Sequence, residues 1–267
     1  MNTRNRFGSA HVTALAAVAI LSATVARAEV LVNYSISSTS GTVSIPPTTL
    51  AAGITATDIT RGSGLTPISL NRGYSSQGWN NSGTTTTTRA DAIAGNKFYT
   101  FSLTIASGSI ASFNDITVGL YKSAITSPAS MEWQYSFDNF VTTGSTLTTF
   151  NHYGRNSGTA PVPLVPDQWM TIDTGGQSNG NPTPALDIST VSALQNVAGP
   201  ATVSFRLYGW GSINGNATTP TNTLAIGRDT GPLINGSIVP EPASICLVAS
   251  AAGIGGLIRI RRRRNES

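Results

Sequence analysis

The chain has 267 residues, of which 16 are basic and 12 acidic, for a formal net charge of +4. Half of the basic residues lie in the two terminal segments, so residues 29–239 hold 8 basic and 10 acidic side chains, a net charge of −2 (8 − 10). This balance argues against nucleic-acid binding, which needs clustered Lys and Arg for phosphate contacts. The single cysteine, Cys246, lies in the C-terminal segment, so we expect no disulfide in the central region.

The N-terminal segment has the pattern of a secretory signal peptide. Two arginines precede an apolar run over 12–25, and Ala26 and Ala28 then supply the small-x-small pattern that signal peptidase reads. We therefore expect residues 1–28 to be a signal peptide that is cleaved before Glu29. The region that follows would then be exported.

Residues 29–238 show repeated alternation of apolar and polar side chains, which predicts strands. The clearest case is 131–138, whose large apolar residues are Met131, Trp133, Tyr135 and Phe137. The same pattern recurs at 99–105, 116–120, 203–207 and 224–226. Breaker-rich turns separate these segments, and helical periodicity is nearly absent, with 189–197 as the best short candidate. We predict an all-β domain, specifically a single jelly-roll-like β-sandwich.

The exported region offers little for catalysis. Its one histidine, His152, is not accompanied by a Gly-x-Ser-x-Gly motif, and one His without Cys is a poor zinc ligand set. Paired carboxylates hydrolyse glycosides, and the acids near aromatic residues are Glu132, Asp138, Asp167 and Asp173. Glu132 stands on the polar face of its strand, where acids usually serve solubility. We expect no catalytic residues, no cofactor and no metal site, with calcium at Asp138 and Asn139 as the alternative to an ordinary turn.

Carbohydrate binding needs exposed aromatic faces and polar neighbours but no general base. Trp79 has three such neighbours, and a second group lies on one face of 203–210. The candidate glycan-binding residues are Trp79, Arg206, Tyr208 and Trp210. The alternative is that these aromatic side chains cover a second packed face of the domain.

The C-terminal segment begins with Val239, Pro240, Glu241 and Pro242. An apolar run over 243–258 follows, long enough for a short membrane-spanning helix that the prolines keep from extending upstream. The run stops at a cluster of arginines, namely Arg259, Arg261, Arg262, Arg263 and Arg264. By the positive-inside rule these charges stay in the cytoplasm and hold the domain on the other side of the membrane.

Residues 239–264 resemble the PEP-CTERM sorting signal of exopolysaccharide-producing Gram-negative bacteria, which has a Val-Pro-Glu-Pro motif, one hydrophobic helix and an Arg-rich end. The resemblance implies recognition by exosortase, with the motif residues as substrate. Three central stretches, 90–101, 135–140 and 205–211, are similar to a sandwich domain often found in front of this signal.

Together these patterns predict an exported, non-catalytic protein of the cell envelope or exopolysaccharide matrix. Signal peptidase and exosortase are the expected processing enzymes, and the C-terminal helix is the expected membrane tether. The alternative function is that of a secreted carbohydrate-binding module or weak glycosidase. The exopolysaccharide is a candidate partner under either reading.

Overall fold

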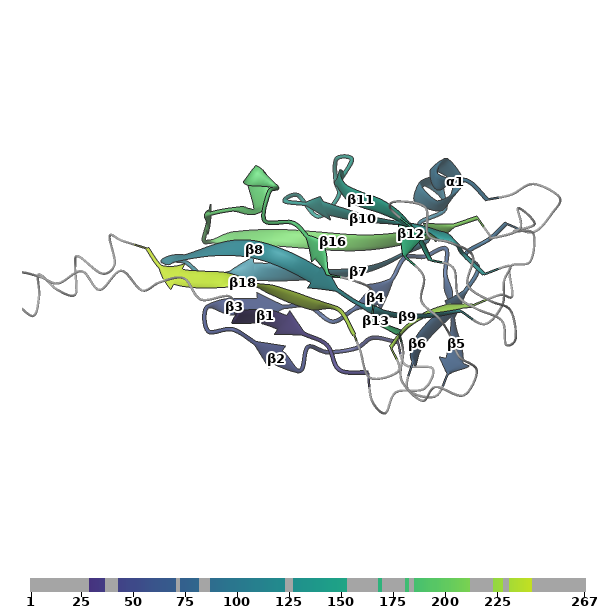
Figure 1. The fold of residues 1–267 in the computed structure, drawn as a ribbon, viewed down its shortest axis with the longest axis horizontal. Coiled ribbons are helices and arrows are strands. Elements are labelled where there is room, and N and C mark those ends of the chain that lie inside the picture. Colours follow the sequence, from purple (N-terminus) through teal and green to yellow (C-terminus); the bar gives the residue numbers. More distant parts are fainter. Residues whose placement is uncertain are drawn as a thin grey trace, which may run out of the picture. The chain divides into compact units, whose positions relative to one another are not determined.

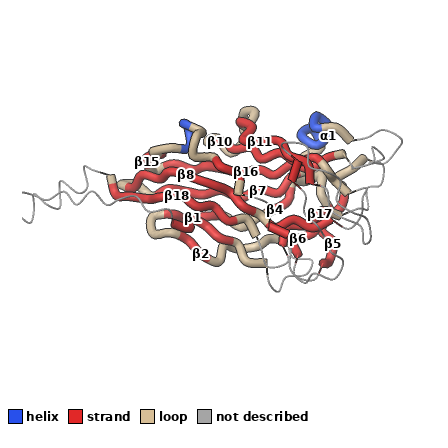
Figure 2. The backbone as a smooth tube through the Cα atoms, viewed as in Figure 1, coloured by secondary structure: helices blue, strands red, loops and turns tan. Residues whose placement is uncertain are grey.

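The computed structural model describes residues 29–36, 43–70, 73–81, 87–122, 127–152, 168–169, 181–182, 185–211, 223–227 and 231–241. Within these ranges the chain is almost entirely strands and loops, and the helices are α1 (Arg89–Ala94) and a 3-10 turn at Ser192–Leu194 (Figure 2). The predicted all-β class is confirmed. No helix in this part of the chain has the length and hydropathy that a membrane crossing requires. The predicted signal peptide and the predicted membrane helix lie outside the described residues.

The strands of the described residues form three sheets (Figure 1). The first has the order β14-β8-β18-β1-β2, with β15 also on β8, and consists of β1 (Glu29–Asn33), β2 (Thr49–Leu50), β8 (Ser109–Thr117), β14 (Leu186–Asp187), β15 (Val197–Ala198) and β18 (Leu233–Pro240). The second has the order β12-β11-β10-β16-β7-β3, with β4 also on β7, and consists of β3 (Ile54–Ala56), β4 (Thr60–Arg61), β7 (Phe98–Ile105), β10 (Ser130–Ser136), β11 (Ser145–His152), β12 (Gln168–Trp169) and β16 (Ala201–Trp210). The third has the order β13-β9-β17-β6-β5 and consists of β5 (Thr66–Leu70), β6 (Gly73–Gln77), β9 (Gly119–Lys122), β13 (Asn181–Pro182) and β17 (Leu224–Gly227). The described pairs are antiparallel except β11 with β12.

One apolar core joins the first two sheets. Phe113 of β8 meets Phe205 of β16 at 6.0 Å between ring centroids, and Phe205 stacks on Phe101 of β7 at 5.5 Å. Trp133 of β10 adds an edge-on contact to Phe101 at 6.2 Å. Such pairs contribute about 0.5–1.5 kcal/mol each beyond the area they bury. The alternation in the sequence therefore identifies the side of the second sheet that packs inward.

The third sheet is joined to the second by hydrogen bonds from a buried tyrosine. The hydroxyl of Tyr99 on β7 donates to the carbonyl oxygens of Tyr74 on β6, at 3.1 Å, and Leu224 on β17, at 2.7 Å. The ring of Tyr74 lies 5.3 Å from that of Tyr99. Because this cluster is buried, the single hydroxyl proton of Tyr99 is shared between two backbone carbonyls that water cannot reach, with the shorter contact to Leu224.

The structure departs from the predicted strands at two points. β10 ends at Ser136, so Phe137 is 46 % exposed and does not join Met131, Trp133 and Tyr135 in the core. The strand ends there because the Ser136 hydroxyl accepts hydrogen bonds from the backbone N–H groups of residues 138 and 140, both at 3.0 Å, which bend the chain into a turn. The predicted segment 116–120 is divided between β8 and β9, in two different sheets.

α1 was not predicted. It begins with a capping box, in which the Thr88 hydroxyl accepts from the backbone N–H of Asp91 at 3.2 Å and the Asp91 carboxylate accepts from the backbone N–H of Thr88 at 2.8 Å. These bonds hold the pKa of Asp91 below its ordinary value. The helix packs Ala92 against Phe98 and Tyr208, and so covers part of the outer face of the second sheet.

Candidate functional site

The outer face of the second sheet is polar but largely covered. Its register places Gln134 of β10 beside Arg206 of β16, and Arg206 beside Thr100 of β7. The polar residues of β10 on this face were expected to be solvated, yet Glu132 is 1 % and Gln134 2 % exposed. Two clusters of side chains lie on this face, one around Glu132 and one around Arg206.

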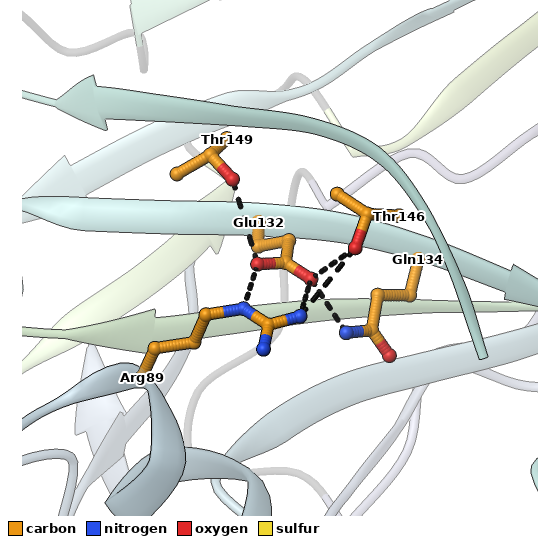
Figure 3. Close-up of polar contacts among 5 residues, drawn as sticks. All are labelled: Arg89, Glu132, Gln134, Thr146 and Thr149. Atoms are coloured by element: carbon orange, nitrogen blue, oxygen red, sulfur yellow. Dashed lines mark hydrogen bonds and ion pairs between the residues drawn. The ribbon is translucent and has the colours of Figure 1, made fainter. Parts of the chain in front are cut away.

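Donors from a helix and two strands surround the Glu132 carboxylate (Figure 3). Arg89 of α1 donates to both carboxylate oxygens, with Nη2 to Oε1 at 2.7 Å. Thr146 of β11 donates its hydroxyl to Oε1 at 2.8 Å, and Gln134 donates its amide at 2.5 Å. Thr149 makes a longer contact of 3.5 Å to Oε2.

These bonds determine the charge of Glu132. Burial on its own would raise the pKa of this carboxyl, but the hydrogen bonds from Arg89, Gln134 and Thr146 outweigh burial and hold the pKa below its ordinary value. A general acid must be protonated and reach its substrate, and Glu132 is ionised, saturated and inaccessible. The expectation that Glu132 lies on a solvated strand face is therefore wrong, because Arg89 of α1 and Thr146 of β11 cover it.

The prediction that Trp79 forms an exposed platform for a sugar is also wrong. Trp79 has 0 % exposure, its Nε1 donates to the carbonyl of Ser76 at 2.9 Å, and its ring meets that of Tyr99 at 5.1 Å. Gly209 of β16 makes room for it, since a Cβ at that position would lie 3.1 Å from the indole. The indole is buried in the main core and offers no face to a sugar ring.

The second candidate group, Arg206, Tyr208 and Trp210, does not form one exposed binding surface. Arg206, Tyr208 and Trp210 do share the face opposite Phe205 and Leu207, but Tyr208 is 3 % exposed because it packs edge-on against Phe98 at 5.3 Å. Trp210 is half-buried against the same cluster. The aromatic rings thus form a small second packed layer under α1, and Arg206 is left as the polar member of the group.

Arg206 lies in a groove that sequence reasoning did not find. The groove has a volume of about 620 Å³, and among its lining residues are Asp58, Arg61, Asn96, Thr100, Asn139 and Arg206. These residues come from four separate stretches of chain, so no local pattern marks them as a group. The positive φ of Asn96, 51°, and of Asn139, 56°, are tolerated by asparagine.

Two rings hold the Arg206 guanidinium. Its Cζ lies 4.0 Å from the ring centroids of Phe98 and of Phe140. Its Nη1 donates to the Tyr208 hydroxyl at 3.3 Å, and its Nε is buried without an acceptor. In the described part of the chain no carboxylate forms an ion pair with Arg206. This cation is oriented by aromatic contacts and keeps unused donors.

The loop that supplies Phe140 is tightly built. Asp138 accepts hydrogen bonds from the Ser136 hydroxyl and from the hydroxyl and backbone N–H of Thr142, at 2.6 and 3.0 Å, and these bonds lower the pKa of Asp138 to about 2. Asn139 and Phe140 then both have positive φ, with 61° at Phe140. A bulky residue in this region costs roughly 1–3 kcal/mol, so the surrounding contacts must hold it there. The Asp138 carboxylate is engaged in closing a turn.

Several predicted sites cannot be compared with the structure. Ala26, Ala28, Pro242 and the five terminal arginines lie outside the described residues, as do Asp167 and Asp173. His152 ends β11, but its side chain is outside the described part. Among the described residues no group of three or more His, Cys, Asp or Glu side chains is placed to share a metal ion.

The first residues of the predicted sorting motif are paired within the first sheet. Val239 and Pro240 are the last residues of β18, paired with Ile110 and Ser109 of β8. The backbone N–H of Glu241 donates to the carbonyl of Gly108 at 2.9 Å. The motif therefore begins within the sheet and not in a separate linker.

No family model, no curated protein and no solved structure matches this chain.

Proposed function

We propose that the chain is an exported, non-catalytic protein of the cell envelope or exopolysaccharide matrix. In this proposal signal peptidase removes residues 1–28, the helix over 243–258 tethers the protein, and exosortase processes the motif at 239–242. The central domain, residues 29–238, is proposed to be a single jelly-roll-like β-sandwich, which the shared core of the first two sheets supports.

The observation that supports this proposal best is where the domain starts and stops. β1 begins at Glu29, the residue expected to follow signal cleavage, and β18 ends at Pro240 inside the motif. The two strands are antiparallel neighbours, with Glu29 paired to Gly236. The chain therefore enters and leaves at the same end of one sheet. A domain with both ends on one side suits attachment to a membrane from that side.

A binding or structural role is favoured over catalysis by the state of Glu132. This acid was one of the four candidates named from the sequence, and its carboxylate is hydrogen-bonded to Arg89, Thr146 and Gln134. A second candidate function, carbohydrate binding, is favoured by the groove at Arg206. The groove supplies hydroxyl and amide groups next to a cation and needs no catalytic acid.

Intact-mass analysis of the protein from its producing cells, combined with fractionation, tests the export proposal. We expect envelope or extracellular material whose N-terminus is Glu29 and whose C-terminus lies near the motif. Replacing Pro240 and Glu241 with alanine should leave the terminal arginines attached without changing the new N-terminus. Full-length protein in the cytosol would contradict the proposal.

A further inference from the structure

We propose that the groove at Arg206 binds a carboxylated saccharide, such as a segment of a uronic-acid polysaccharide. This inference rests on the proposed function in one respect only: export is what would bring the groove into contact with an extracellular polysaccharide. The binding itself is argued from the charge, hydrogen-bonding groups and volume of the groove.

The charge of the groove selects an anion. Among the described residues that line it, the ionisable side chains are Asp58, Arg61 and Arg206, which gives a net charge of +1 (2 − 1) within a region of the chain that is acidic overall. The Asp58 carboxylate accepts a hydrogen bond from the Ser44 hydroxyl at 2.6 Å. The groove is thus locally cationic on a domain that would otherwise repel polyanions.

Of the two arginines in the groove, Arg206 is the one with unused donors. Arg61 gives Nε to the Ser76 hydroxyl at 2.6 Å and Nη2 to the Ser75 carbonyl at 2.9 Å, and its Cζ lies 3.6 Å above the Tyr74 ring. It therefore links β4 to β6. Arg206 makes a single hydrogen bond within the described residues, to Tyr208, and its Cζ lies over two phenylalanine rings. Because Nε is buried, a planar carboxylate would be bound through the two Nη groups.

The remaining lining suits a polyol. Thr60, Thr100 and Ser102 line the groove with hydroxyl groups, while Asn96 and Asn139 add amides. The Thr100 hydroxyl donates to the Phe205 carbonyl at 2.9 Å, and the Ser102 hydroxyl is hydrogen-bonded to that of Ser204 at 2.8 Å. These hydroxyls keep lone pairs that can accept from sugar hydroxyl groups, and the amides can both donate and accept. A volume of about 620 Å³ lies within the usual range for small-molecule sites, roughly 300–1,000 Å³. A sugar that carries a carboxylate combines both requirements, whereas a neutral sugar leaves the Arg206 charge unmatched.

The test is isothermal titration of the full-length chain, purified in mild detergent, with tetragalacturonate and with its methyl-esterified form. We expect saturable binding of the free acid, and at least about tenfold weaker binding of the ester and of the R206Q variant, because each removes one partner of the charge pair. Asn96→Gly, which keeps the positive φ and removes the amide, should weaken binding several-fold.

A matched pair on β7 provides the control. Thr100→Ala lies in the groove and should weaken binding, whereas Thr104→Ala, on the same strand and face but outside the groove lining, should leave it unchanged. Near-UV circular dichroism checks that each variant is folded. If R206Q does not fold, the comparison of saccharide binding by Asn96→Gly and by Thr104→Ala tests the proposal instead.

The proposal is overturned if tetragalacturonate does not bind, if the ester binds as well as the acid, or if the groove variants bind as tightly as Thr104→Ala. Failure of binding leaves the export proposal intact, because the mass and fractionation experiment reads the ends of the chain and not the groove.

Discussion

Two arginines meet the same polar face of the second sheet, Arg89 from α1 and Arg206 from β16, yet their surroundings differ in one decisive respect. Arg89 is matched to the buried Glu132, which also accepts from Gln134 and Thr146. Arg206 contacts the rings of Phe98 and Phe140 and has no acid partner in the described residues. Arg89, which is paired with Glu132, fastens α1 to the sheet. Arg206 is held by rings but has no carboxylate partner among the described residues, so its charge remains available to a ligand.

The comparison also explains which side chains the fold depends on. Glu132 is buried, whereas Arg89 is 48 % exposed, so removing Arg89 leaves a buried carboxylate without its cation. Removing Arg206 leaves two aromatic rings and a tyrosine hydroxyl, and no carboxylate among the described residues loses an ion-pair partner. Replacing Arg89 should therefore lower the free energy of unfolding by a large amount, and replacing Arg206 by a small amount.

The largest effect is expected for Arg89→Met. The variant leaves Glu132 buried with only neutral donors. Because Arg89 is 48 % exposed, we expect the free energy of unfolding to fall by about 2 kcal/mol, which is less than for a fully buried pair. Urea unfolding followed by tryptophan fluorescence measures it. Adding E132Q in the same chain should restore a substantial part of the loss. A loss under about 0.5 kcal/mol would show that the ion pair behaves as an ordinary surface pair.

A smaller effect is expected from acid. Because the pKa of Glu132 is lower in the folded chain than its ordinary value of 4.5, folding favours the ionised form. Its contribution to stability is fully present above the unfolded pKa and is lost as pH falls through the lower folded pKa. Urea midpoints taken from neutral pH down to about pH 3 should therefore fall less steeply in E132Q than in the unmodified chain. Equal slopes would mean that Glu132 does not titrate with folding.

For R206Q we expect a loss in unfolding free energy of about 1 kcal/mol, from two cation–π contacts at a partly exposed site. The same urea experiment measures it, with Arg89→Met as the comparison. A loss as large as that of Arg89→Met would mean that Arg206 is also a structural charge with a partner.

The smallest effect on stability is expected for Phe140→Gly. Glycine relieves the positive φ of 61° at this position, while the contact with Arg206 disappears, so the two changes nearly cancel to within about 1 kcal/mol. Saccharide binding should nevertheless weaken, because the guanidinium loses one of the rings that orient it. Thermal unfolding and titration of the same sample measure both. Tight binding in this variant would show that Phe140 does not preorganise the site.

The sequence predicted the strands and their inward faces well, because period-two alternation in β7, β10 and β16 depends only on local pleating. It did not predict that the outer face is covered. α1 has only six residues and a single fully buried side chain, Ala92, so its only clear signal is the spacing of Thr88 and Asp91.

Trp79 shows why the rest of the site could not be predicted. A lone tryptophan among polar residues resembles an exposed platform, but its burial depends on Tyr99 and on the space left by Gly209, which are distant in sequence. The groove at Arg206 likewise brings together residues near 58, 96, 139 and 206. Such groupings arise from sheet register and loop placement, which periodicity does not specify.

The most direct test of the central contrast is a titration of the full-length chain with tetragalacturonate, followed through the arginine Nε–H resonances in nitrogen-15 spectra. We predict that the Arg206 signal shifts and becomes protected from exchange as the ligand saturates, while the Arg89 signal stays in place. A shift at Arg89 with Arg206 unchanged, or no shift at either, would contradict the account.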